Sequence, residues 1–385
     1  NMASVQGGNA AHTANEQGRM LNFAAGPSAL PLSVLKKVQE ELLNWHGTGV
    51  SIMEIGHRSS DFAKIIGEAE SDLRTLLSIP ENYSVLFMQG GGTGQFAAVP
   101  LNLLDTDTDQ ADYLVTGGWS KKASQEAAKF AKVNVVYDGD SSGFETVPKD
   151  LECGKESKYF YFCANETIHG VEFSDLPVKS EGRVLVADMS SNFLSREINV
   201  SDYGVIVAGA QKNAGIAGLV IVIVRKDLLK ETSTKVPTAL SYFATDQGKS
   251  VLNTPPTFAI YVSGLVFKWL REDCGGLKAV ERANIEKAQK FYEFIDSTHG
   301  FYHNAVDPAY RSRMNVPLRI SKAGNPTLEA LFVKEAAKQG LTSLGGHASV
   351  GGLRVSLYNA TPLSSVLTLI EFMKSFYEQH KDEVK

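Results

Sequence analysis

The sequence predicts an α/β protein with a large, mainly parallel sheet and a smaller α+β unit. Short runs rich in β-branched residues alternate with helical segments between positions 83 and 224, which is typical of a doubly wound sheet. The chain has 385 residues, a length that predicts about two or three domains. Its hydrophobic fraction of 43% is sufficient for a well-filled core.

The chain opens with a polar stretch at positions 1–20, which is typical of a disordered leader or an expression remnant. Order is expected to begin near Leu21. A helix is expected from Ser33 to Leu43, with Ser33 as its cap, and a strongly amphipathic helix from Asp61 to Leu77. The loop at 51–60 joins these two helices.

That loop carries His57 and Arg58 side by side. Exposed basic residues are ordinary, so a solvated pair is one interpretation. The other interpretation is that the two residues bind an anion from a mobile loop.

A glycine run at Gly90–Gly94 follows one expected strand and opens a helix. Such a turn presents backbone N–H groups, and the helix N-terminus adds partial positive charge, so the segment suits a phosphate. Gly92 to Ala97 also matches a dinucleotide fingerprint, with Asp112 about 20 residues further on. In that fingerprint the acid lies at the end of the second strand of the unit, but Asp112 precedes the run Tyr113–Val115. A phosphate cradle is therefore preferred.

Polar and aromatic residues follow the next strands, at the carboxyl ends where such sheets bind ligands. They are Trp119, the stretch Asn165–Thr167, and Asp188. Each alone could be a core tryptophan, a turn asparagine or a helix N-cap. The strands of this region are expected at Val85–Met88, Tyr113–Thr116, Val133–Tyr137, Tyr159–Cys163 and Val184–Ala187, with a helix at Lys121–Phe130.

The stretch Tyr203–Val224 predicts two buried strands joined by a hairpin of small residues. Its loop carries one charge, Lys212. An amine between apolar strands is poorly solvated, which lowers its pKa and favours the nucleophilic form. A lysine that extends from a surface turn is the alternative for this stretch alone.

Taken together, these residues fit pyridoxal phosphate. That cofactor needs a lysine for the Schiff base, a carboxylate for the pyridine nitrogen, a phosphate cradle and usually an aromatic surface. The chain supplies Lys212, Asp188, the glycine run and Trp119. The freed Lys212 amine is the natural base to move the substrate's Cα proton.

Composition limits the partners and the compartment. The net charge of -5 gives no basic field for nucleic acid. No apolar run is long enough to span a bilayer. Three cysteines, Cys153, Cys163 and Cys274, lack metal-site spacing and predict free thiols in a reducing compartment, hence a cytoplasmic protein without a metal.

The C-terminal part predicts the smaller unit. Its expected elements are helices at Phe258–Leu270, Val280–Ile295, Leu328–Gln339 and Val366–Tyr377, and strands at Ser312–Ile320 and Leu353–Tyr358.

Nine motifs resemble the phosphoserine aminotransferase family, within the class V, fold-type I pyridoxal phosphate enzymes. They occur in the family's order, from position 22 to the end of the chain. They are NFAAGPSALP at 22–31, GHRSSDF at 56–62, QGGGTGQFAAVPLNL at 89–103, ANETIHGVEF at 164–173, DMSSNFLS at 188–195, GAQKNAG at 209–215, NTPPTF at 253–258, SRMNVP at 312–317 and GGLRVSLYNA at 351–360.

The resemblance implies a role for each matching residue around the cofactor. Lys212 would form the Schiff base and Asp188 would pair with the pyridine nitrogen. Trp119 would stack on the ring and Thr167 would contact its phenolic oxygen. The phosphate would be held by Gly92, Thr93 and Gln211, and by Asn253 and Thr254 of the neighbouring subunit of a homodimer.

The resemblance also implies the substrate contacts. Arg354 would clamp the α-carboxylate, and His57 and Arg58 would grip the distal phosphate or carboxylate, assisted by His347 from the facing subunit. Many relatives carry a His-Arg pair where this chain has His347 and Ala348, so weaker phosphoserine binding is expected.

The implied reaction is reversible transamination between glutamate and 3-phosphohydroxypyruvate, giving O-phosphoserine and 2-oxoglutarate in serine biosynthesis. The implied domains are a large cofactor-binding domain at 32–273 and a small domain made of 21–31 and 274–385. Another class V aminotransferase with a different distal-anion preference, a cysteine desulfurase and a dinucleotide-binding module remain alternatives.

Overall fold

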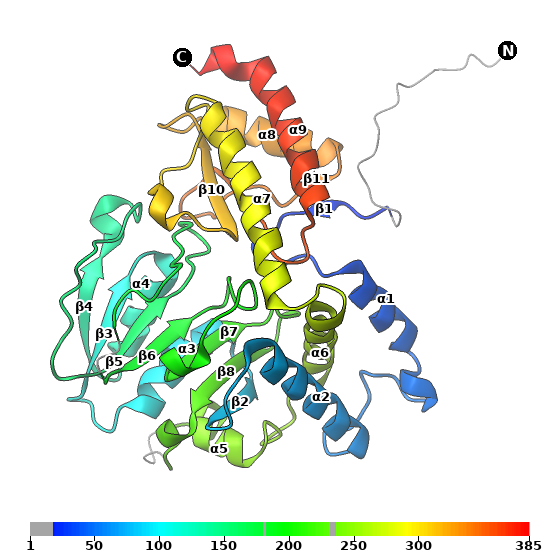
Figure 1. The fold of residues 1–385 in the computed structure, drawn as a ribbon, viewed down its shortest axis with the longest axis vertical. Helices are drawn as coiled ribbons and strands as arrows, with labels where there is room; N and C mark the ends of the chain where they lie inside the picture. Colours follow the sequence, from blue (N-terminus) through cyan, green and yellow to red (C-terminus); the bar gives the residue numbers. More distant parts are fainter. Residues whose placement is uncertain (1–17, 180–181, 232–235, 385) are drawn as a thin grey trace.

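The computed structural model describes residues 18–179, 182–231 and 236–384, and shows two units that share one long helix (Figure 1). Most of the leader expected at 1–20 therefore lies outside the described residues. Within the described part of the chain, no helix has the length and apolar character needed to cross a membrane.

A seven-stranded sheet forms the larger unit. Its strands run parallel except β8, which is antiparallel to both neighbours. The mainly parallel sheet predicted from the sequence is confirmed. In spatial order the strands are β2 (Tyr83–Met88), β8 (Val220–Arg225), β7 (Val205–Gly209), β6 (Val184–Asp188), β5 (Ser157–Cys163), β3 (Gln110–Val115) and β4 (Lys132–Asp138).

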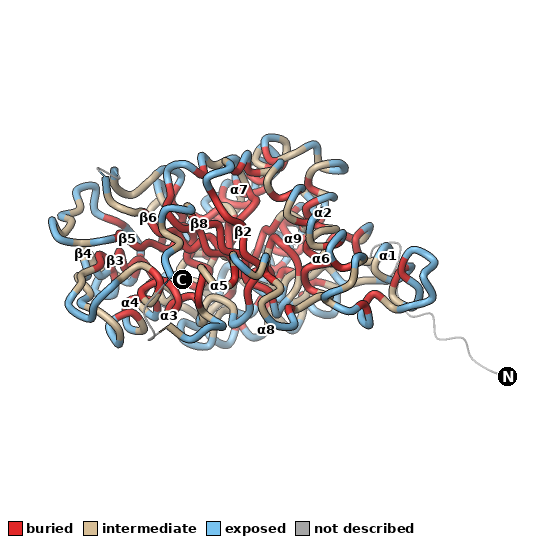
Figure 2. The backbone as a smooth tube through the Cα atoms, turned by 90° about the horizontal axis from the view of Figure 1, so that it is seen from below, coloured by how far each residue is buried: buried red, intermediate tan, exposed pale blue. Residues whose placement is uncertain are grey.

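Helices cover both faces of this sheet, so its central strands are buried on both sides and consist of nearly continuous apolar runs. Along β2, Val85 and Phe87 join the core beneath α2 and α6, whereas Leu86 and Met88 join the core beneath α3 and α4. Figure 2 shows the buried strands as a band between two exposed layers. The helices of this unit are α1 (Leu32–Glu41), α2 (Ser60–Leu77), α3 (Gly91–Leu103), α4 (Gly118–Ala127), α5 (Tyr242–Gln247) and α6 (Thr257–Glu272).

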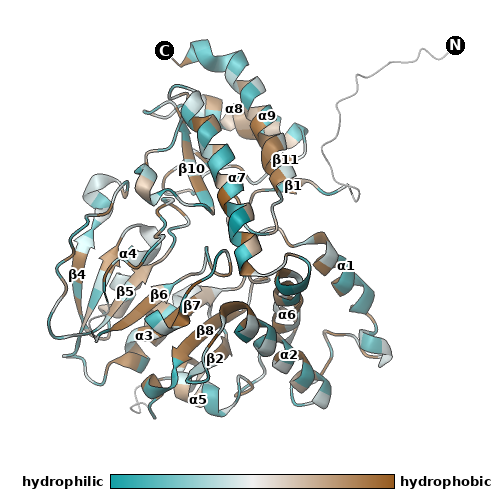
Figure 3. Ribbon diagram, in the orientation of Figure 1, coloured by the Kyte–Doolittle hydropathy of each residue, from teal (hydrophilic) through white to brown (hydrophobic). Residues whose placement is uncertain are grey.

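The smaller unit has an apolar core of its own, separate from the two cores of the large sheet. Figure 3 shows hydrophobic residues concentrated in the central strands and along one side of α9. Its elements are α7 (Leu277–Ser297), α8 (Pro326–Lys338), α9 (Leu363–His380), an antiparallel sheet of β9 (Tyr302–His303), β10 (Asn315–Ile320) and β12 (Leu353–Ser356), and the parallel pair β1 (Leu21–Asn22) and β11 (Leu341–Thr342).

Helix α7 contributes to both units. Leu277 and Val280 belong to the core of the large unit, whereas Phe291 and Ile295 belong to that of the small unit. The domain boundary expected at residue 273 stays a prediction.

Two helix starts differ from expectation. Pro31 occupies the N-cap of α1 and no side chain caps it, so the predicted Ser33 cap is wrong. Ser33 lies inside the first turn, because the fixed φ of Pro31 already starts the chain into the helix. This helix also ends at Glu41, which leaves Leu43 83% exposed. Helix α4 begins at Gly118, three residues before the predicted Lys121, for a reason found in the site.

Candidate active site

A cavity of about 410 Å³ lies where β2, β3, β5 and β6 end, and the small unit lines part of it. Nine of the predicted site residues line it, from both units. They are Gly92, Thr93, Trp119, Thr167, Asp188, Gln211, Lys212, His347 and Arg354.

Lys212 lies in the loop between β7 and β8, as the hairpin prediction required. Its Nζ donates a hydrogen bond to Thr167 Oγ1 at 2.7 Å. Desolvation in the cavity lowers the pKa of Lys212, and the nearby acidic groups, Asp188 first, only partly oppose this. The amine is therefore shifted toward its neutral, nucleophilic form.

The N-terminal segment packs directly on this lysine. Gly26 has a φ of +133°, and a Cβ at this position would lie 3.2 Å from Lys212 Cγ. Ser28 Oγ donates to the Lys212 carbonyl at 2.6 Å. A side chain at position 26 would therefore press on the Lys212 side chain, a constraint that sequence reasoning missed.

Asp188 is the last residue of β6 and is 4% exposed. Its Oδ1 accepts from the backbone N–H of Ser190 at 2.9 Å, and Tyr161 donates to Oδ2 at 3.4 Å. A carboxylate has about four acceptor sites, so it can also receive a donor from a bound group.

The glycine run forms the N-terminus of α3. Gly90 is the N-cap, with a φ of 90°, and no side chain caps the helix. The first N–H groups of a helix have no acceptor within it, and they carry partial positive charge. Because Gly90 to Thr93 line the cavity, these donors are suited to an anion there.

Asp112, the acid of the rival dinucleotide interpretation, lies inside β3 and is 0% exposed. Its carboxylate accepts from Asn134, Gly154 and Ser157. It therefore ties neighbouring strands together and is not available to a ribose.

Trp119 is held through the start of α4. Glu166, which is 0% exposed, accepts from the backbone N–H of Trp119 at 3.1 Å and of Ser120 at 2.8 Å. His169 Nδ1 accepts from Gly118 N–H at 3.1 Å, and burial lowers the pKa of His169 to about 4, so the ring stays neutral. These caps come from the loop after β5, which explains why α4 starts before the predicted position.

Two basic residues reach the cavity from the small unit. Arg354 lies on β12, and its Nη1 is 3.4 Å from the Thr167 carbonyl. His347 lies in the loop before β12, with its Nδ1 2.7 Å from Ser349 Oγ. Burial and the charges of Arg354 and Lys122 lower the pKa of His347.

His347 was expected from the facing subunit, and in the structure it lines the cavity of its own chain. Its loop is paired there through the backbone, since Gly346 N–H donates to the Gly352 carbonyl at 2.8 Å, and a contribution to a partner's cavity stays a prediction.

Four predicted residues do not line this cavity. His57 and Arg58 lie in the loop before α2 and contact each other at 3.3 Å between Nε2 and Nε. Asn253 and Thr254 lie in the segment before α6, where the Thr254 carbonyl accepts from Gln89 Nε2 at 2.9 Å.

Residues 20–369 match the family model described as aminotransferase class-V. The chain is 51% identical over 380 residues to phosphoserine aminotransferase 2, chloroplastic, of Arabidopsis thaliana, covering 98% of this chain and 89% of that protein. It is 50% identical over 364 residues to phosphoserine aminotransferase of Marinomonas sp., covering 94% and 99%. The chain belongs to the phosphoserine aminotransferase family.

Solved structures of phosphoserine aminotransferases share this fold. The protein from Bacillus circulans subsp. alkalophilus is 41% identical, with a TM-score of 0.90 over 94% of this chain and 99% of that one. The pyridoxal phosphate-bound protein from Trichomonas vaginalis is 40% identical, with a TM-score of 0.85 over 92% of this chain and 100% of that one. The predictions of fold, enzyme class and family are confirmed.

The cavity fits pyridoxal phosphate, the cofactor of class-V aminotransferases. The uncapped N-terminus of α3 offers donors to a phosphate, Lys212 offers an amine whose pKa is lowered by burial, and Asp188 offers a carboxylate. Trp119 Nε1 is buried without a hydrogen-bond partner among the described residues, although its ring lines the cavity.

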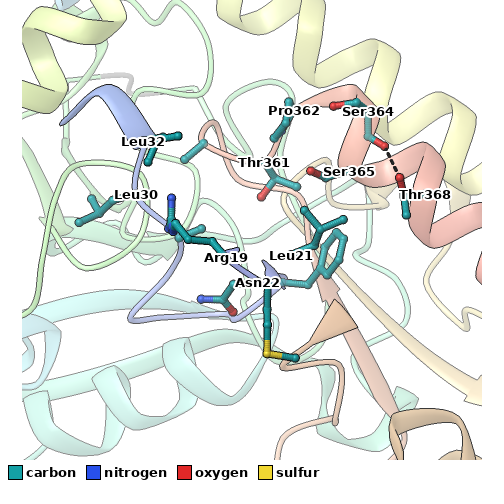
Figure 4. Close-up of a pocket in the computed structure, with 14 residues that line it drawn as sticks. Arg19, Leu21, Asn22, Leu30, Leu32, Thr361, Pro362, Ser364, Ser365 and Thr368 are labelled. Atoms are coloured by element: carbon teal, nitrogen blue, oxygen red, sulfur yellow. Dashed lines mark hydrogen bonds between the residues drawn. The ribbon is translucent and has the colours of Figure 1, made fainter. Parts of the chain in front are cut away.

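A second cavity, of about 350 Å³, lies between the N-terminal segment and the start of α9 (Figure 4). Arg19 is the one charged residue among the described residues that line it. Among the described residues that line it, there is no lysine for a Schiff base and no carboxylate for a ring nitrogen.

Proposed function

We propose that the chain catalyses reversible transamination between glutamate and 3-phosphohydroxypyruvate, giving O-phosphoserine and 2-oxoglutarate in serine biosynthesis. The observation that carries the proposal is the meeting of Lys212, Asp188 and the uncapped start of α3 in one cavity, beside Arg354 and His347. The names of the relatives support the choice of substrates.

When bound, pyridoxal phosphate supplies an electron sink for the pair released from the Cα–H bond. Lys212 would then carry the proton, since burial lowers its pKa and favours the neutral amine. Thr167, 2.7 Å from Nζ, orients that amine. The Asp188 carboxylate would hold the protonated ring nitrogen.

The remaining cofactor contacts are assigned to Gly92, Thr93 and Gln211 for the phosphate and to Trp119 for the ring face. Arg354 would bind the substrate α-carboxylate through its planar guanidinium. His347 would meet the second anion of the substrate, which is a phosphate in phosphoserine and a carboxylate in glutamate.

The active enzyme is proposed to be a homodimer with shared sites. His57, Arg58, Asn253 and Thr254 do not line the cavity of their own chain. In a dimer they would reach the cavity of the partner, the histidine and arginine at the distal anion and the other two at the cofactor phosphate. The proposed location is cytoplasmic, supported by three free cysteines.

A desulfurase is disfavoured by the thiol nearest the site. Cys163 lines the cavity, but burial raises its pKa well above the usual value, and Sγ donates to the Asn165 carbonyl at 3.3 Å. A buried, protonated thiol is a poor nucleophile.

The activity test is phosphoserine formation from glutamate and 3-phosphohydroxypyruvate, compared with glyoxylate as acceptor. We expect activity with the phosphorylated acceptor and none in Lys212→Ala. Preference for glyoxylate would overturn the substrate assignment.

The dimer test mixes Lys212→Ala chains with Arg58→Ala chains. A mixed dimer has one site with both residues intact, so mixing should restore activity that neither variant has alone. Absence of restoration in a verified mixed dimer would place both residues in the same site.

A further inference from the structure

A lysine that the sequence analysis did not single out lies beside the cavity. Lys122 is on α4, one turn after Trp119, and its Nζ is 4.8 Å from the centroid of the Trp119 ring. Trp119 lines the cavity, and Lys212 Nζ is 5.8 Å from the same centroid. The ammonium of Lys122 is therefore within reach of the site while its side chain remains exposed.

Lys122 differs from the lysine next to it in its partners. Lys121 Nζ lies 2.7 Å from Asp140 Oδ2 and is neutralised by it. Among the residues that the structure describes, no carboxylate makes an ion pair with Lys122. Contact with the face of the half-buried Trp119 indole is weaker than a charge-assisted hydrogen bond, so a dianion in the cavity would compete for this ammonium effectively.

Lys122 is electrostatically coupled to a second basic residue of the cavity. Its charge, together with burial and Arg354, lowers the pKa of His347, so the Lys122 ammonium acts on the same imidazole as the Arg354 guanidinium. The residue after His347 is Ala348, which has no charge. If Arg354 binds the α-carboxylate, His347 and Lys122 are the basic groups of this chain left for the second anion.

We propose that Lys122 is a specificity-determining residue that binds the distal anion of the substrate in its own chain's cavity. The proposal rests on the proposed function, which supplies a substrate with a phosphate at its far end. The flexible four-carbon stem lets the ammonium move from the Trp119 face to that phosphate. Because it acts as a point charge, Lys122 favours a phosphate dianion over a carboxylate.

The test compares Lys122→Gln with the matched control Lys121→Gln in the holoenzyme. The probes are 3-phosphoglycerate, which has both anions but neither an amino nor a keto group, and glycerate, which lacks the phosphate. In Lys122→Gln, calorimetry should show about tenfold weaker binding of 3-phosphoglycerate, the change that one charge-assisted hydrogen bond supports. Glycerate binding should stay within about twofold of wild type, as should both probes in Lys121→Gln.

Kinetics give an independent readout. In Lys122→Gln the KM for phosphoserine should rise about tenfold with kcat nearly unchanged, and Lys122→Arg should restore the wild-type KM, since it keeps the charge. Equal weakening of both probes, or behaviour identical to Lys121→Gln, overturns the proposal while the proposed function stands. The proposed function can also fail on its own. If the wild-type protein forms no phosphoserine, while the Lys122→Gln variant still binds 3-phosphoglycerate more weakly than wild type, the proposed function is overturned and the anion contact stands.

Discussion

Replacing Glu166 with glutamine should destabilise the start of α4 and loosen Trp119. In the wild-type chain, one carboxylate oxygen accepts from Ser120 N–H at 2.8 Å and Ser120 Oγ at 2.5 Å, and the other accepts from Trp119 N–H at 3.1 Å. Glutamine keeps one acceptor oxygen and turns an –NH₂ group toward a backbone donor.

The size of the effect follows from these contacts. Losing a charge-assisted hydrogen bond costs about 1.5–3 kcal/mol. Losing a buried negative charge at a helix N-terminus adds up to about 2 kcal/mol. Burial raises the pKa of Glu166, which shows that its carboxylate carries a desolvation cost, and glutamine removes that cost. We therefore expect the free energy of unfolding to fall by about 2–4 kcal/mol.

Urea unfolding of the apoenzyme measures this loss, and titration with pyridoxal phosphate, followed by absorbance, measures the weaker cofactor affinity. The matched control is Glu126→Gln on the exposed side of the same helix. Glu126 pairs with Lys129 at 2.5 Å near solvent, so its loss should cost less than about 1 kcal/mol.

A second perturbation tests the same contact without removing the charge. In Gly117→Ala the new Cβ would lie 2.4 Å from the Glu166 carboxyl carbon and must displace it. Both variants should lose stability and cofactor affinity together. A destabilised Glu166→Gln protein that binds cofactor as tightly as wild type would refute the link from Glu166 to Trp119.

Three further outcomes are expected. Ala348→Arg should lower the KM for phosphoserine by adding a charge beside His347; unchanged steady-state kinetics would discard this. Burial lowers the pKa of Lys212 in the folded apoenzyme below its ordinary value of 10.5. At pH values between the lowered pKa and 10.5, Lys212 is therefore protonated mainly in the unfolded chain. Apoenzyme stability should therefore rise with pH across this window, measured by urea unfolding. Lys212→Met should make that rise smaller, and the buried Lys287, whose pKa is lowered to about 7, should account for a remaining rise. Lys287 Nζ donates to three carbonyls of residues 357–361 at 2.9–3.0 Å. The free energy of unfolding, measured in urea, should therefore fall by about 2–4 kcal/mol in Lys287→Met, and by less than about 0.5 kcal/mol in Lys290→Met, where the lysine is exposed.

The strands and the Lys212 hairpin could be predicted because their signal is local. Strands buried on both faces are short apolar runs, and the small residues between β7 and β8 mark the turn. The glycine run at the start of α3 could be predicted as a turn into a helix for the same reason, because the order strand, glycine, helix is a local signal; its phosphate-binding role stays a prediction.

The start of α4 could not be predicted because its caps are distant in sequence. Glu166 lies 46 residues from Ser120, and His169 lies 51 residues from Gly118. The local capping signal is weak, because Gly117 at the N-cap has no side chain and the local contribution is Ser120 Oγ, which accepts from Gly117 N–H at 3.2 Å, so the helix was expected to begin later. The place of His347 in the cavity of its own chain likewise depends on the backbone pairing of its loop, which has no local sequence signal, and its contribution to a partner's cavity stays a prediction.

Buried amides join the two units beside the cavity that contains Lys212 and Arg354. Asn165, at the end of β5, donates to Asn315 Oδ1 on β10 at 2.8 Å. Asn315 Nδ2 in turn donates to Ser356 Oγ, just beyond Arg354, and to the Tyr358 hydroxyl, each at 3.0 Å. Apolar contacts tolerate sliding, but buried hydrogen bonds are directional and costly to leave unmade. This network therefore fixes the position of Arg354 relative to the Lys212 loop, although the two residues belong to units with separate cores.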